Sequence, residues 1–303
     1  MGTPEAAVPS LRQLLEDGHE VVAVWTQPDK PSGRGKKVAV PPVKLAAQVL
    51  GLEIHQPAKV RTDEAKDLFA SHKADLAVVV AYGRILPAEF LRAPRRGCLN
   101  VHFSLLPAYR GAAPVNWAIV NGEAKTGVTT MFIEEELDAG PILLQRETPI
   151  GEKETAPELR MRLSDMGAEL LGETLKQLDT ITPRPQHKQD ATFAPMLKRE
   201  DGLIDWSRNA ATLEHSVRGF QPWPNAFTHD KAGRLIVRSA EIVEGDAKHG
   251  VGEVIAAHGD ELVVTCGEET ALRLLEVQPE AKRRMSVRDY LNGTHLKIGE
   301  RFE

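Results

Sequence analysis

The sequence predicts an α/β protein of two domains: a mostly parallel sheet domain over residues 1–181, a linker over 182–200 and a smaller β-barrel domain over 201–303. The chain has 303 residues, more than one hydrophobic core usually fills. Apolar strand-like runs alternate with helical patterns up to about residue 180, which favours a parallel sheet. Later the pattern becomes short strands separated by Gly- or Asp-containing turns, which is typical of a small barrel.

The first part of the α/β domain shows the alternation most clearly. Its predicted elements are a helix over 5–17, a strand over 21–25, a loop over 28–42, helices over 42–50 and 62–73, and a strand over 76–81. Gly18 and Gly51 directly follow two of these helices, at the position where glycine is favoured as a helix stop. The last strand is an unbroken apolar run, which suits a strand buried on both faces of a parallel sheet.

The same pattern continues to residue 178 and then changes. The next predicted elements are a strand over 98–103, a helix over 113–121 and a strand over 127–133. Thr155 and Glu158 form a capping box, and apolar residues keep helical spacing behind it. Prolines and weak periodicity then predict the linker. The predicted barrel strands are 232–243, 250–256, 261–265 and 271–278.

The beginning of the chain is unusual for a parallel α/β domain. Gly2, Thr3 and Pro4 form a turn, and such a domain needs its first strand just before that turn. Without this strand the sheet would have an unfilled slot and unpaired backbone groups. We therefore expect the natural protein to start several residues upstream with a short apolar strand, and this sequence to be truncated.

Asn100 and His102 form the candidate catalytic pair. Along a strand, Asn100 and His102 point to one face, while Leu99, Val101 and Phe103 point to the other. An amide donor beside an imidazole suits a reaction that develops an oxyanion, and an aspartate from a later loop can orient or charge the imidazole. An Asn-x-His pair on a strand can equally be a satisfied sheet-end pair.

Several short sequence motifs include this pair or follow it along the chain. They are Asn-Val-His (100–102), Ser-Leu-Leu-Pro (104–107), Arg-Gly-Ala-Ala-Pro (110–114), Thr-Gly-Val-Thr (126–129), Leu-Asp-Ala-Gly (137–140), Phe-Gln-Pro-Trp-Pro (220–224) and Lys-Arg-Arg-Met-Ser (282–286). In this order the words resemble those of the folate-dependent formyltransferases, above all the members that act on initiator tRNA. The resemblance implies a Rossmann-like formyltransferase domain followed by an OB-like, tRNA-binding barrel.

The resemblance also implies a reaction. A formyl group would pass from 10-formyltetrahydrofolate to the α-amino group of methionine on initiator tRNA, for translation initiation. Asn100 and protonated His102 would bind the oxyanion, while Asp138 would hold His102 charged and help pass a proton to N10 of the folate. The folate-binding word would be Ser104, Leu105, Leu106 and Pro107. The reaction requires no metal.

A cationic loop contains the predicted tRNA contacts Arg34, Lys36 and Lys37. The loop lacks the Gly and Ser/Thr positions of a Walker phosphate loop, so it does not predict a nucleotide site. By resemblance it would inspect the first pair of the initiator acceptor stem. Arg34 can pair with base edges through its planar guanidinium, whereas Lys36 and Lys37 suit phosphates.

Composition excludes several other classes of protein. We find no apolar run long enough to span a bilayer and no signal peptide, so we expect a cytoplasmic protein without membrane contact. Two distant cysteines, Cys98 and Cys266, predict neither a disulfide framework nor a zinc site. The net charge of −5 restricts any tRNA contact to local clusters of cations. We expect a monomer.

Two alternatives share parts of this pattern. One is a formyltransferase of the same superfamily that acts on a small amine such as an amino sugar nucleotide; the other is an inactive RNA-binding homologue. The first gives no reason for the cationic loop, and the second gives none for retaining Asn100, His102 and Asp138. The family commonly has Phe where this chain has Ala6 and a small residue where it has Phe103, which bears on the acceptor pocket and on the loop after His102.

Overall fold

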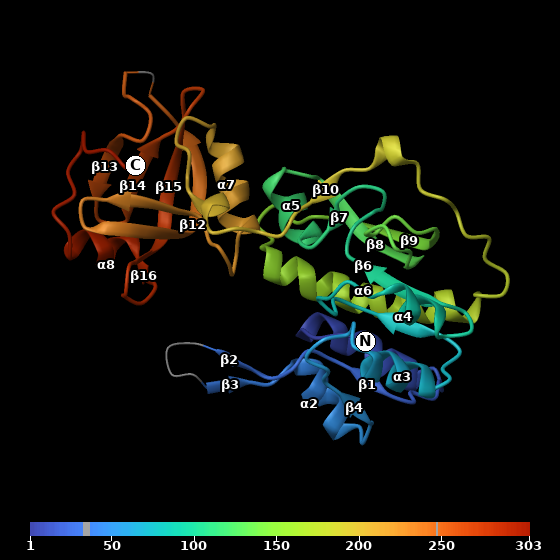
Figure 1. Cartoon of the computed structure of the whole chain (residues 1–303). Helices are drawn as coiled ribbons and strands as arrows, with labels where there is room; N and C mark the ends of the chain where they lie inside the picture. The colour runs from blue at the N-terminus through green and yellow to red at the C-terminus, as the bar shows by residue number, and fades with distance from the viewer. Residues whose placement is uncertain (33–36, 247) are drawn as a thin grey trace. The chain divides into compact units, whose positions relative to one another are not determined.

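The computed structural model describes residues 1–303 except 33–36 and 247, and its chain forms two compact units (Figure 1). The first unit comprises Met1–Pro114, Lys125–Pro149 and Arg160–Ala194; the second comprises Val115–Ala124, Ile150–Leu159 and Pro195–Glu303. Among the described residues, no helix is both long and apolar enough to cross a membrane.

A four-stranded sheet lies at the centre of the first unit. Its order is β5 (Ala77–Val79), β6 (Cys98–His102), β8 (Lys125–Phe132) and β9 (Ile142–Pro149). Strands β5 and β6 are parallel, whereas β8 is antiparallel to both β6 and β9. The sheet is thus mixed rather than mostly parallel, because the strand predicted for 127–133 is antiparallel to its neighbours. An antiparallel neighbour needs no long crossover connection, and β9, which the sequence did not predict, follows β8 directly.

The first unit also contains short strand pairs separate from this sheet. They are β1 (Val24–Trp25) with β4 (Ile54–His55), β2 (Lys30–Ser32) with β3 (Lys37–Ala39), and β7 (Arg110–Gly111) with β10 (Phe193–Ala194). The β2–β3 pair is antiparallel and lies in the stretch that we predicted as loop. The β7–β10 pair joins the centre of the first unit to a stretch that composition marked as linker.

The predicted helices of the first unit are present with small shifts at their ends. The helical elements are η1 (Glu5–Ala7), α1 (Val8–Glu16), α2 (Pro42–Val49), α3 (Asp63–Ser71), α4 (Ala88–Arg92) and α6 (Ala156–Lys176), whose first turn belongs to the second unit. Thr62 caps α3 by accepting a hydrogen bond from the Ala65 backbone, and the Glu158 side chain accepts bonds from Thr155 at the start of α6. Gly18 follows α1 with φ +80°.

Helix α6 covers one face of the central sheet (Figure 1). The approach is close at Gly167, where an added Cβ would lie 2.9 Å from Val101. The Thr174 hydroxyl also lies 2.8 Å from the Thr130 hydroxyl of β8. Glycine is therefore needed in this helix for packing rather than for backbone conformation.

The N-terminal residues lie between β1 and β5. Gly2 forms a parallel bridge with Val80 and donates its backbone N–H to Trp25. A cavity of about 470 Å³ beside these residues is lined in part by Val24 and Val78. A strand before Gly2 stays a prediction.

The second unit is built on one antiparallel sheet. Its path is β11 (Phe227–Asp230), β12 (Gly233–Glu244), β15 (Thr270–Pro279), β14 (Glu261–Thr265) and β13 (Val254–His258), with β16 (Met285–Ser286) paired to β15. The helices of this unit are α5 (Pro114–Val120), whose first residue belongs to the first unit, α7 (Ala210–Gly219) and α8 (Val287–Asn292). Short 3-10 turns, η2 (Lys188–Asp190) and η3 (Glu200–Gly202), lie in the segment before α7.

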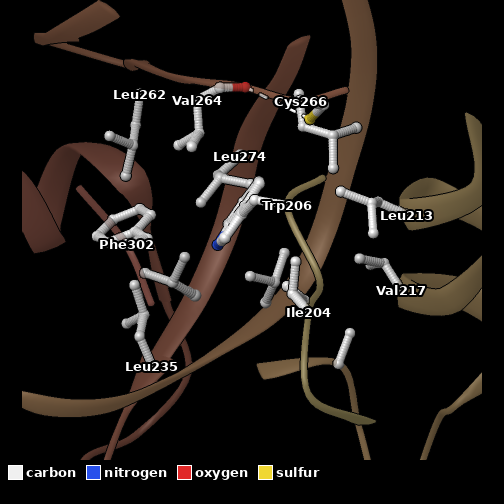
Figure 2. Close-up of a cluster of buried hydrophobic side chains, with 14 of the residues drawn as sticks. Ile204, Trp206, Leu213, Val217, Leu235, Leu262, Val264, Cys266, Leu274 and Phe302 are labelled. Carbon is white, nitrogen blue, oxygen red and sulfur yellow. Dashed lines mark hydrogen bonds between the residues drawn. The ribbon is translucent and has the colours of Figure 1, made fainter. Parts of the chain in front are cut away.

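Buried apolar side chains from this sheet and from α7 and α8 form the core of the second unit. Figure 2 shows Leu262, Val264 and Leu274 beside Trp206 and Phe302, all of them almost fully buried. The alternating strand pattern places these side chains on one face. The four predicted strands are all present, but the described ladder runs openly from β11 to β13 and does not show a closed barrel.

Candidate active site

Strand β6 positions the two residues of the candidate pair. Asn100 and His102 are two residues apart on this strand and therefore share a face. Val101 lies on the opposite face, against Gly167 of α6. In the sheet, Asn100 is opposite Val79 of β5, and His102 is the last residue of its strand. The structure thus confirms the prediction that Asn100 and His102 lie on one face of a strand.

His102 is almost fully buried, and both of its ring nitrogens face oxygen atoms. The Nε2 atom lies 3.0 Å from the backbone carbonyl of Tyr109. Because a carbonyl can only accept, this nitrogen is the donor. The Nδ1 atom lies 3.7 Å from Oδ2 of Asp138. The fold thus brings the predicted aspartate to the predicted histidine from a position 36 residues later in the chain.

Asp138 is held in a left-handed backbone conformation with φ +49°. Its Oδ2 atom accepts a hydrogen bond of 2.9 Å from the Gly111 backbone N–H. The Asp138 side chain is 12% exposed. The carboxylate is therefore partly screened from water and has one fixed donor besides the histidine.

The side-chain amide of Asn100 is the available donor at this site. It has no hydrogen-bond partner among the described residues, although the side chain is half-buried. An unpaired donor can bind a ligand oxygen without first breaking a protein contact. The roles of Asn100 and His102 in catalysis stay a prediction.

The word from Ser104 to Pro107 forms a fixed loop directly after β6. The Thr129 hydroxyl donates to the Ser104 carbonyl and accepts from the Leu106 backbone N–H. Gln145 donates to the Leu106 carbonyl at 2.8 Å. Ser104 and Leu106 are buried, whereas Leu105 and Pro107 are half-buried. The loop conformation is set by β8 and β9, the antiparallel strands beside it.

A glutamine that the sequence did not single out joins this site. Gln186 accepts hydrogen bonds at 3.0 and 2.8 Å from the guanidinium of Arg110, which is 2% exposed. Its amide nitrogen donates to the carbonyls of Asp138 at 2.9 Å and Gly140 at 2.8 Å. No periodic pattern marks Gln186, because it follows a proline-rich stretch. The sequence pointed only to its partner Arg110, which lies eight residues after His102.

The predicted tRNA contacts are only partly described. Arg34 and Lys36 lie outside the described residues, and Lys37 begins β3, where it pairs with Ser32. Ala6 is buried in η1, and Phe103 is buried on the side of β6 that faces Gly167. Within the described part of the chain, no group of three or more His, Cys, Asp or Glu side chains is placed to hold a metal ion.

Comparison with known proteins identifies the family. A formyl transferase family model matches residues 1–175, and a model of the formyl transferase C-terminal domain matches residues 196–295. The methionyl-tRNA formyltransferase of Caldanaerobacter subterraneus subsp. tengcongensis is 46% identical, over 99% of this chain and 97% of the relative. That of Citrifermentans bemidjiense is 47% identical, over 99% and 94%.

Solved structures show the same fold. The N-formyltransferase from Helicobacter canadensis, in complex with folinic acid and dTDP-3-aminofucose, matches with a TM-score of 0.68 at 17% identity, over 90% of this chain and 96% of that one. At this identity the likeness concerns the fold alone. The family models and the full-length similarity of the curated relatives carry the assignment, and they show that this chain belongs to the family of the methionyl-tRNA formyltransferases.

Proposed function

We propose that this chain transfers the formyl group of 10-formyltetrahydrofolate to the α-amino group of methionine on initiator tRNA, for translation initiation in the cytoplasm. The observation that carries the proposal is the similarity, at 46–47% identity over almost the whole chain, to enzymes named methionyl-tRNA formyltransferase. The arrangement of Asn100, His102 and Asp138 supports it, because the three side chains suit an acyl transfer through an oxyanion.

The reaction needs little activation of its nucleophile. A free α-amino group has a pKa of about 7.7–8.0, and esterification of the carboxyl group lowers it, so much of the amine is neutral near neutral pH. The amine nitrogen forms a bond to the formyl carbon, and the formyl oxygen becomes an oxyanion. The Asn100 amide donates to this oxygen, and the His102 imidazolium adds positive charge beside it.

Collapse of the intermediate breaks the bond between the formyl carbon and N10 of the folate. The attacking nitrogen loses a proton and N10 gains one. His102, balanced by the Asp138 carboxylate, is the group through which we propose that this proton passes. The separation of 3.7 Å between Nδ1 and Oδ2 is longer than a hydrogen bond, and such contacts commonly tighten when substrate binds.

The remaining parts of the proposal concern binding. We propose that Ser104, Leu105, Leu106 and Pro107 form the wall of the folate site, since Thr129 and Gln145 fix the backbone of this loop. Residues 1–181 would be the Rossmann-like catalytic domain, and residues 201–303 an OB-like barrel that binds tRNA. The reaction as written requires neither a metal nor a second subunit, so we propose a monomer without metal.

The two alternatives are less well supported. A small-amine acceptor gives no reason for the full-length similarity to enzymes named for tRNA. An inactive RNA-binding homologue gives no reason for the unpaired Asn100 amide beside His102 and Asp138.

A direct assay tests the proposal. Purified protein is incubated with 10-formyltetrahydrofolate and either methionyl initiator tRNA, methionyl elongator tRNA or an amino sugar nucleotide. We expect formylation of the initiator tRNA and much less of the other two. Formylation of the sugar nucleotide alone would indicate the small-amine alternative, and no formylation of any acceptor by folded protein would indicate the inactive one.

A further inference from the structure

Gln186 connects two parts of the first unit, the strand β7 and the loop that carries Asp138. Its amide oxygen accepts two hydrogen bonds from the buried Arg110 guanidinium. Its amide nitrogen donates one hydrogen bond to each of the Asp138 and Gly140 carbonyls. Both polar atoms of this side chain therefore form hydrogen bonds. These bonds connect the loop that carries Asp138 to Arg110 of β7.

The chain around Arg110 touches the candidate catalytic residues through three consecutive positions. The Tyr109 carbonyl lies against Nε2 of His102, the Arg110 side chain binds Gln186, and the Gly111 N–H binds the Asp138 carboxylate. Asp138 is thus fixed twice, at its carboxylate by Gly111 and at its carbonyl by Gln186.

Such double fixing has a physical reason. Asp138 has φ +49°, a conformation that costs free energy in a residue other than glycine and persists only when its surroundings enforce it. A hydrogen bond to the carbonyl of a left-handed residue restrains its backbone, and a second bond to Gly140 restrains the turn that follows. Loss of these bonds lets the carboxylate move relative to His102.

We propose that Gln186 is a positioning residue for the reaction, which fixes the position of Asp138 relative to His102. The same side chain accepts the hydrogen bonds of the buried Arg110 guanidinium. This inference rests on the proposed function. Only glutamine offers this combination at this length, because one amide oxygen accepts from the guanidinium while one NH₂ group donates to two carbonyls. A glutamate keeps the first contact and loses the second.

The test compares two substitutions. Gln186→Glu keeps an oxygen for Arg110, so the buried guanidinium stays paired and the protein stays folded, but the donors to Asp138 and Gly140 are lost. We expect kcat for initiator tRNA formylation to fall roughly 10- to 100-fold, as for small displacements of catalytic groups, with KM for the folate within about twofold of wild type. Gln186→Ala should lower kcat similarly. A folded Gln186→Glu variant with wild-type kcat would overturn the proposal.

Coupling to Asp138 separates positioning from a general loss of structure. If Gln186 acts through Asp138, then adding Gln186→Ala to Asp138→Asn should lower kcat by less than about threefold further, because effects within one unit are not additive. Full additivity of the two substitutions would contradict the proposal. Gln13, on α1 of the same unit, provides a control, since its amide nitrogen also donates a hydrogen bond, to the Asp17 carboxylate. We expect Gln13→Ala to leave kcat within about threefold of wild type, as for a site without shared partners.

A readout independent of turnover distinguishes failure of this inference from failure of the proposed function. The NMR signals of the His102 ring report its contacts with Asp138 whether or not the protein formylates tRNA. We expect these signals to shift in Gln186→Glu and to stay unchanged in Gln13→Ala. Unchanged His102 signals in Gln186→Glu would overturn the positioning role, whereas inactivity of the wild type alone would overturn only the proposed reaction.

Discussion

His102 Nδ1 lies 3.7 Å from Asp138 Oδ2, the same oxygen that accepts the Gly111 N–H at 2.9 Å. The carboxylate therefore has a fixed orientation before any substrate is present. A side chain whose orientation is already restrained stabilises charge on its neighbour with less reorganisation than a mobile one. The Asn100 amide, which has no partner among the described residues, lies on the same strand as His102.

The first prediction concerns these residues. Replacing His102 by Ala should lower kcat by ~10²–10⁴, because it removes the group through which we propose that the proton passes. Asn100→Ala should lower kcat by ~10²–10³, because it removes one proposed oxyanion donor. Both effects are measured by formylation of initiator tRNA at saturating folate, with circular dichroism to check folding. A folded His102→Ala variant with near-normal turnover would show that the mechanism is wrong.

The second prediction concerns Arg34, which lies outside the described residues. Arg34→Ala should lower kcat/KM for initiator tRNA by an amount equivalent to more than ~1 kcal/mol of transition-state free energy, the order of magnitude of one lost bidentate base contact. Folate binding should stay unchanged. Lys36→Ala or Lys37→Ala should weaken tRNA binding and make it less dependent on salt.

A surface arginine serves as the control for Arg34. Arg95 is 77% exposed and pairs with Asp75. We expect Arg95→Ala to change kcat/KM for initiator tRNA by less than about threefold, because exposed ion pairs contribute little. Equal activity of Arg34→Ala and wild type at the same salt concentration would favour a small-amine acceptor.

The third prediction tests the core shown in Figure 2. Leu262 is fully buried in the second unit. Leu262→Ala should lower the free energy of unfolding by ~2–5 kcal/mol, through lost apolar burial and the cavity that remains. Ile242, on β12, is 52% exposed, and Ile242→Ala should change the free energy of unfolding by less than about 1 kcal/mol. Urea unfolding followed by circular dichroism measures both, and equal losses would contradict this core assignment.

The fourth prediction concerns pH. Burial, together with the neighbouring His55, lowers the pKa of His72 below its ordinary 6.5, and its Nε2 accepts a hydrogen bond from the Trp25 indole. The unfolded chain therefore takes up a proton at higher pH than the folded chain does. The free energy of unfolding should then fall as pH drops below about 6.5, until the lowered pKa of His72 is passed.

A substitution isolates this contribution. His72→Gln removes the titrating group, so the loss of stability between pH 7.5 and pH 5.5 (about one unit either side of the ordinary value) should become smaller. His187 is exposed in the same unit, and His187→Gln should leave the pH dependence unchanged. Urea unfolding at the two pH values measures each variant, and an unchanged slope in His72→Gln would refute the prediction.

Much of the local structure follows from the sequence because it depends on near neighbours. Thr155 and Glu158 marked the start of α6 by spacing alone, and the strand over 261–265 was predicted with the bounds that the structure has. The shared face of Asn100 and His102 follows from the period of two in any strand. The family, too, was evident from words that lie within short stretches of the chain.

What the sequence by itself determined about this protein is therefore its class, most of its elements and the residues of its candidate site. The tertiary structure decided how those residues are held. The antiparallel course of β8, the approach of Asp138 to His102 and the link from Arg110 to Gln186 depend on the path of intervening loops. Arg110 and Gln186 are 76 residues apart. No local propensity encodes such a contact, because it forms only when the whole first unit brings β7 and the segment before β10 together.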